Sequence, residues 1–87
     1  MAQDFYLVTF PSTHFVIKMD HLLKDQGLKT SVIGTPGQIK AGCGLSLRVP
    51  LDDKAQVIKQ IESLNTAYES IYLVKRQAVK NEYISIS

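Results

Sequence analysis

Residues 28–49 read LKTSVIGTPGQIKAGCGLSLRV, and this stretch decides the fold. Leu28 to Ile33 and Leu45 to Val49 are rich in β-forming residues, and in the second segment apolar and polar residues alternate. Such alternation is typical of a strand with one buried face. Eleven residues, Gly34 to Gly44, separate the two segments. The stretch therefore predicts two antiparallel strands joined by a hairpin loop that is long for its class.

A strand and a helix precede this hairpin, and a helix and a strand follow it. The predicted elements are a strand over 5–10, a helix capped by Ser12 or Thr13 and ended by Gly27, a helix over 55–64 capped by Asp52 or Asp53, and a strand over 70–74. The apolar residues expected to face the core are Phe15, Met19, Leu22 and Leu23 in the first helix, and Ala55, Ile58, Ile61 and Leu64 in the second.

The order β-α-β-β-α-β is that of a split βαβ unit, so we expect an α/β protein of the α+β type. The prediction is a ferredoxin-like sandwich with a four-stranded antiparallel sheet in the order 4-1-3-2 and two helices on one face. Residues 1–76 would form this single domain, and residues 77–87 a C-terminal tail. The tail includes a strand-like segment, Tyr83 to Ser87, which can be frayed, pair across a sheet edge or contact a second copy in a homo-oligomer.

Composition narrows the class of protein. Hydrophobic residues make up 45% and charged residues 21% of the sequence, as in an ordinary folded domain. A formal charge of +2 attracts polyanions only weakly, and the basic cluster of Lys75, Arg76 and Lys80 is expected to be solvated, so no nucleic-acid partner is expected. We expect no signal peptide and no membrane span. One cysteine cannot form an internal disulfide, so the expected location is cytoplasmic.

The long loop carries the distinctive chemistry of the sequence. Cys43 lies between Gly42 and Gly44, which lets another molecule approach the sulfur closely. If the alternation of the following strand extends back to Cys43, its side chain points to the helix side of the sheet. The start of the first helix, Ser12 to His14, should lie at the same edge and would favour a thiolate there. Against this, a lone cysteine is often a small buried hydrophobe, and His14 is often simply solvated.

These residues resemble the putative Se/S carrier protein-like family of small bacterial proteins, over roughly Phe5 to Leu73. The parts that carry the resemblance are Phe10 with Ser12-Thr13-His14, the Pro36 loop, and Cys43-Gly44-Leu45. The resemblance implies a carrier in which Cys43 holds a persulfide or a selenium-loaded sulfur. In that family an arginine commonly follows the loop proline, whereas Gly37 follows it here, and Lys40 is the candidate substitute. Asp20 fills the acidic position of the first helix.

The sequence therefore predicts a carrier rather than a turnover enzyme, with no cofactor. Cys43 is assigned as the nucleophile, and Ser12, Thr13 and His14 are expected to stabilise its thiolate. Gly42 and Gly44 would give access to the sulfur. Pro36 and Lys40 would shape the loop and supply a positive charge. Because a second cysteine is lacking, transfer would run between proteins, from a sulfur or selenium donor to an acceptor. The alternative is a small-ligand-binding or protein-interaction module in which Cys43 is inert.

Three other uses of this fold fit the sequence less well. A metallochaperone needs paired soft ligands, and the chain has one cysteine. An RNA-binding domain on this fold would carry aromatic residues on the strand over 45–49, which has none. A zinc site would have to combine His14, His21 and Cys43, without a fourth ligand. No metal is expected.

Overall fold

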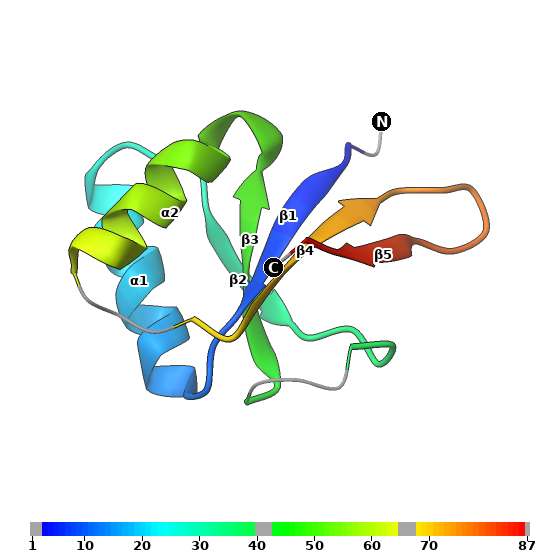
Figure 1. Ribbon diagram of the computed structural model, residues 1–87, viewed down its shortest axis with the longest axis horizontal. Helices are drawn as coiled ribbons and strands as arrows, with labels where there is room; N and C mark the ends of the chain where they lie inside the picture. Colours follow the sequence, from blue (N-terminus) through cyan, green and yellow to red (C-terminus); the bar gives the residue numbers. More distant parts are fainter. Residues whose placement is uncertain (1–2, 40–42, 65–67, 87) are drawn as a thin grey trace.

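The structure is a computed structural model, and it describes residues 3–39, 43–64 and 68–86. These residues form two helices and a five-stranded antiparallel sheet in the order β2-β3-β1-β4-β5 (Figure 1). The elements are β1 (Phe5–Thr9), α1 (Thr13–Asp25), β2 (Ser31–Gly34), β3 (Leu45–Pro50), the short 3-10 helix η1 (Leu51–Asp53), α2 (Lys54–Ser63), β4 (Ser70–Lys75) and β5 (Glu82–Ser85). The expected α+β class is thus confirmed.

The fifth strand corrects the expectation of a four-stranded ferredoxin-like sandwich. β5 pairs antiparallel with β4, and the backbone N–H of Ile86 continues the ladder by donating to the carbonyl of Ile71 at 2.9 Å. The physical reason is that β4 would otherwise be an edge with unpaired backbone groups, which the C-terminal segment satisfies by folding back along it. Of the three expectations for this segment, pairing across an edge is the one observed.

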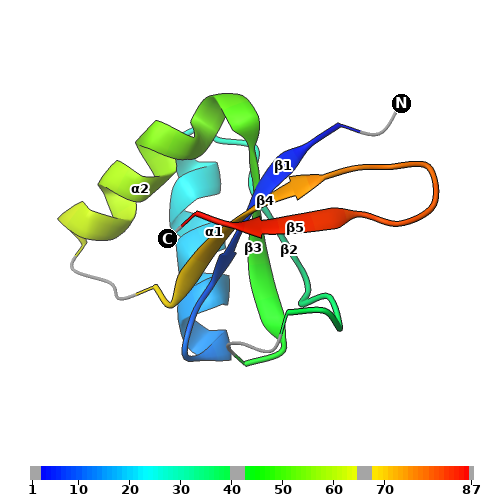
Figure 2. The same ribbon diagram turned by 45° about the vertical axis from the view of Figure 1, so that its right-hand side comes forward.

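Each face of the sheet carries its own apolar cluster. Both helices lie against one face, which we call the helix side (Figure 2). Its fully buried core includes Val8 and Phe10 of the β1 segment, Leu47 of β3, and Val57 of α2. The opposite face, which we call the open side, holds a smaller cluster of Phe5, Leu7, Ile39 and Val74. Alternation along the strands sends neighbouring side chains to different clusters.

The second helix buries a different stripe from the expected one. Val57 and Ile61 are fully buried, while Ile58 is half-buried and Leu64 is 45% exposed. The expected residues followed a three-residue step, which drifts around a helix of 3.6 residues per turn, whereas positions four apart stay on one face. The prediction for Ala55 and Leu64 was therefore wrong. In α1, Met19 and Leu23 are buried as expected.

Candidate functional site

The loop between β2 and β3 is closed at its base by the backbone. The N–H of Thr35 donates to the carbonyl of Gly44 at 2.9 Å, and the hydroxyls of Thr35 and Ser46 hydrogen-bond to each other. Pro36 then begins a turn in which its carbonyl accepts from the N–H of Ile39 at 3.0 Å. Pro36 thus stands at the start of the turn that ends at Ile39. Two other candidates, Lys40 and Gly42, lie outside the described residues.

The described residues on either side of positions 40–42, Ile39 and Cys43, lie on opposite faces of the sheet. Ile39 is 7% exposed and packs on the open side with Phe5, Leu7 and Val74. Cys43 packs against the helix-side cluster, as the alternation of β3 predicted. Ile39 and Cys43 therefore contact different apolar clusters, although only three positions separate them in the sequence.

Cys43 is half-buried, and its thiol has a polar partner. The Sγ atom donates to the carbonyl of Leu45 at 3.7 Å, a weak hydrogen bond that involves the protonated form of the sulfur. Gly44 follows with φ of +92°, in the left-handed region that glycine adopts readily and other residues do not. Gly44 therefore sets the direction of the chain between Cys43 and β3, which is a more specific role than access alone.

The start of α1 lies at the edge of the sheet where β3 begins (Figures 1 and 2). Ser12 is the N-cap residue, and its Oγ accepts from the N–H of His14 at 3.2 Å while its carbonyl accepts from the N–H of Phe15 at 3.1 Å. The amide of His14 is thus already used within the cap. Thr13, the first helical residue, keeps an amide for which no partner is found among the described residues.

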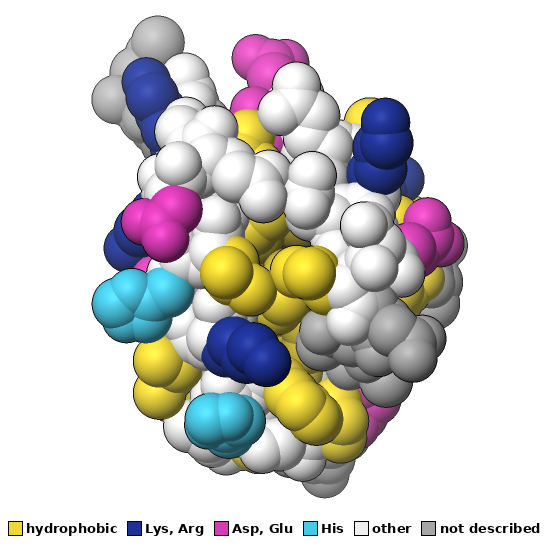
Figure 3. Space-filling view, turned by 90° about the vertical axis from the view of Figure 1, so that its left-hand side faces the viewer, with side chains coloured by type: hydrophobic (Ala, Val, Ile, Leu, Met, Phe, Trp, Pro, Cys, Tyr) yellow, Lys and Arg dark blue, Asp and Glu magenta, His cyan; other side chains and the backbone are white. Residues whose placement is uncertain are grey.

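The helix surface around this start is mixed in character. The side chain of His14 is exposed, and both histidines of the chain lie on the face formed by the helices, beside apolar side chains (Figure 3). Among residues 3–39, 43–64 and 68–86, no three His, Cys, Asp or Glu side chains are grouped as a metal site would require. Within those same ranges no helix is long and apolar enough to span a membrane.

Comparison with models of protein families identifies the family of this chain. Residues 5–73 match the family described as "Putative Se/S carrier protein-like", from the first residue of β1 well into β4. The chain belongs to this family. No curated protein and no solved structure matched the chain. The matched range includes Cys43 and the start of α1, and it ends before β5.

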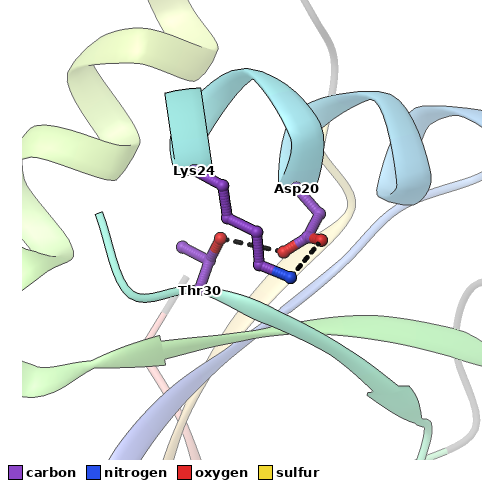
Figure 4. Close-up of polar contacts among 3 residues, drawn as sticks. All are labelled: Asp20, Lys24 and Thr30. Atoms are coloured by element: carbon purple, nitrogen blue, oxygen red, sulfur yellow. Dashed lines mark hydrogen bonds and ion pairs between the residues drawn. The ribbon is translucent and has the colours of Figure 1, made fainter. Parts of the chain in front are cut away.

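Asp20, the acidic residue of α1 in this Se/S carrier-like chain, binds two neighbouring side chains. Asp20 is 8% exposed, accepts a hydrogen bond from the Thr30 hydroxyl at 2.9 Å and pairs with the Lys24 ammonium at 2.9 Å (Figure 4). Thr30 directly precedes β2, so Asp20 joins α1 to that strand. The i, i+4 spacing of Asp20 and Lys24 was the signal available in the sequence. Among residues 3–39, 43–64 and 68–86, no hydrogen bond or ion pair joins this cluster to the sulfur of Cys43.

A surface groove lies away from the cysteine. It is lined by Gln3, Asp4, Lys29, Arg48, Pro50, Leu51 and Asp52, around the end of β3 that is far from Cys43. Arg48 extends beside it on the open side, with its guanidinium 4.8 Å from the centre of the Phe5 ring. The groove holds charges of both signs and no nucleophile, so the chemistry of the family is better sought at Cys43.

Proposed function

We propose that this chain carries sulfur or selenium on Cys43, bound as a persulfide or its selenium counterpart. The observation that carries the proposal is that the chain belongs to the Se/S carrier-like family while Cys43 is its single cysteine. The scaffold would be a ferredoxin-like arrangement extended by β5. We assign the protein to the cytoplasm, where a free thiol stays reduced.

The transfer step is an exchange between two sulfur atoms. The Cys43 thiolate attacks the outer sulfur of a persulfide on a donor protein. A new S–S bond forms at Cys43 as the S–S bond of the donor breaks, and the donor cysteine leaves as a thiolate. No net oxidation occurs. An acceptor thiolate removes the outer sulfur in the same way, so the cycle needs donor and acceptor proteins but no cofactor.

We propose the following roles for the residues around Cys43 in the sequence and at the start of α1. Ser12 organises the start of α1, and the amide of Thr13 is the donor we assign to the thiolate. His14 is proposed as a nearby cation or base. Gly42 and Gly44 give access to the sulfur, Pro36 shapes the loop, and Lys40 supplies the positive charge that Gly37 lacks.

A second candidate function is favoured by one specific observation. The thiol of Cys43 donates to the Leu45 carbonyl and packs against the helix-side cluster, as an inert, structural cysteine would. In that case the chain is a binding or interaction module whose loop contacts a small ligand or a partner. The two functions differ in whether Cys43 is chemically modified.

Mass spectrometry of the protein purified from its own cells tests the proposal. We expect a Cys43 peptide heavier by about 32 Da, the mass of one sulfur, that returns to the unmodified mass after reduction. In vitro, a low-molecular-weight persulfide should load the native protein, and Cys43→Ser should remain unloaded. A folded native protein that takes up no sulfur under these conditions supports the binding module instead.

The family's arginine offers a matched variant. A Cβ atom at Gly37 would meet no atom within 4 Å, and its backbone is not in the left-handed region, so Gly37→Arg should fold normally. If an arginine here holds an anionic persulfide, the variant should load faster than the native protein. Gly37→Gln, which adds length without charge, is the control. Equal loading of both variants would exclude the charge effect.

A further inference from the structure

No strand in the described part of the chain pairs with the outer side of β5. β5 is the edge of the sheet, beyond β4. The N–H of Ile86 donates to the carbonyl of Ile71, so the groups of Ile86 face β4. In an antiparallel ladder this orientation alternates along the strand. The N–H and C=O groups of Tyr83 and Ser85 therefore point outward, ready to pair with another strand.

This edge lacks most of the features that usually protect an edge strand. Proteins block such edges with short strands, charged side chains, proline, bulges or a covering helix, and β5 has only its short length and one charge. β5 contains no proline and no lysine, and Glu82 is its single charged residue. The main helix contacts are of α1 with β2 and β3 and of α2 with β3, so the helices lie toward the opposite edge (Figure 1). Nothing among the described residues covers β5.

The outward groups complement a second copy of the same strand. If a twofold axis passes beside Ile84, Tyr83 lies opposite Ser85 of the second copy, and Ser85 lies opposite Tyr83 of the second copy. Each opposed pair exchanges two N–H to C=O bonds, which makes four backbone hydrogen bonds in total. All outward-facing groups within Glu82–Ser85 are then satisfied.

Side chains and charges favour the same axis. The two Ile84 side chains would face each other as a close non-hydrogen-bonded pair, and Ile86, which is 41% exposed, would gain cover beside them. The two Glu82 residues would stand four residue steps apart, about 13 Å, so they repel only weakly. An axis at Tyr83 would bring them within about 7 Å and be disfavoured.

We propose that two copies of this chain associate through β5, as an antiparallel pair centred on Ile84 that continues the sheet from one copy to the other. β5 lies outside the family match, and the association does not depend on the carrier function. A pair of short strands buries less than the roughly 1,200 Å² of standard interfaces, so the dimer should be weak, with a Kd in the micromolar range.

Sedimentation velocity tests the association. Between about 5 and 500 µM, a span that brackets such a Kd, the native protein should shift from monomer to dimer. Ser85→Pro removes an outward N–H that β4 does not use, and it should weaken dimerisation at least tenfold. Ser85→Ala keeps that N–H and should dimerise like the native protein. A native protein that is monomeric throughout, or a folded Ser85→Pro that dimerises normally, overturns the proposal.

Cross-linking tests the register, and it remains decisive if Ser85→Pro does not fold. In a Cys43→Ser background, Ile84→Cys places two thiols directly opposite each other across the axis, at a separation a disulfide can span. Oxidised glutathione should convert this variant to a covalent dimer, with release of reduced glutathione. Glu82→Cys in the same background should remain monomeric, because its thiols stand about 13 Å apart. Equal cross-linking of both variants overturns the register.

Discussion

Ile39 and Cys43 flank positions 40–42 of the loop between β2 and β3, and we call them its two described ends. They are held in opposite ways. Ile39 is buried among aromatic and aliphatic side chains on the open side. Cys43 is only half-buried on the helix side, with a weak thiol hydrogen bond to Leu45. Part of the unusual length of this loop is therefore structural, since the chain must place Ile39 on one face and return to the other.

The largest expected effect separates the core from the cysteine. Leu47 is fully buried in β3, so Leu47→Ala should lower the free energy of unfolding by about 2 to 5 kcal/mol. Cys43→Ser should lower it by less than about 1.5 kcal/mol, because the side chain is small and partly exposed. Urea denaturation of both variants measures the difference. A loss at Cys43 as large as that at Leu47 would mean that both ends of the loop are structural.

The next effect concerns the buried end of the loop. Ile39→Ala should cost about 2 kcal/mol, at the low end for a buried isoleucine because the open-side cluster is small. Gln38→Ala, at an exposed neighbouring position, should change stability by less than about 0.5 kcal/mol. The same urea experiment applies. If Ile39→Ala proved as mild as Gln38→Ala, the contrast between the two ends of the loop would disappear.

The sequence predicted the elements better than the edges of the sheet. Strands with regular alternation, such as β3, were recognised because one buried face imposes a period of two. β5 remained ambiguous, since its alternation is equally compatible with a frayed tail. Whether this segment forms a strand depends on its pairing with the outer side of β4, which is a tertiary contact between distant parts of the chain. The stripe on α2 was misplaced because apolar residues also occur outside the buried face.

The candidate site was predictable in part. Alternation along β3 placed Cys43 on the helix side, and residue preference identified Ser12 as one of two possible caps. The anchoring by Ile39 was missed, although an isoleucine in a polar loop was a signal. That Ser12 itself uses the amide of His14 could not be foreseen while Thr13 was an equal candidate for the cap.

A smaller effect tests the backbone beside the cysteine. Gly44 has φ of +92°, yet a Cβ atom there would meet no atom within 4 Å. Gly44→Ala should therefore cost about 1 kcal/mol through backbone strain alone. Gly37→Ala, also in open space but without a positive φ, should be neutral or slightly stabilising. Thermal unfolding of the pair measures this difference, and equal midpoints would show that the conformation of Gly44 costs alanine nothing.

The smallest expected effect concerns the reactivity of Cys43. If the start of α1 stabilises the thiolate as proposed, Cys43 should react faster with an electrophile than the thiol of an unstructured peptide does. A stabilised thiolate is also a weaker nucleophile, so we expect alkylation by uncharged iodoacetamide to be only about threefold faster than in the peptide. An uncharged reagent prevents Lys40 from biasing the encounter.

Variants at the helix start identify the source of this reactivity. Thr13→Pro removes the amide for which no described residue is a partner. Proline suits this first helical position because Ser12 already has an extended backbone, with φ of −140° and ψ of 137°. We expect the variant to fold and to lose most of the threefold excess. His14→Ala should lower the rate only if its ring contributes. If the hydrogen bond to Leu45 dominates instead, it shields the sulfur from the reagent. Native Cys43 would then react more slowly than the peptide up to pH 9 while the protein stays folded, and the carrier function should yield to the binding module.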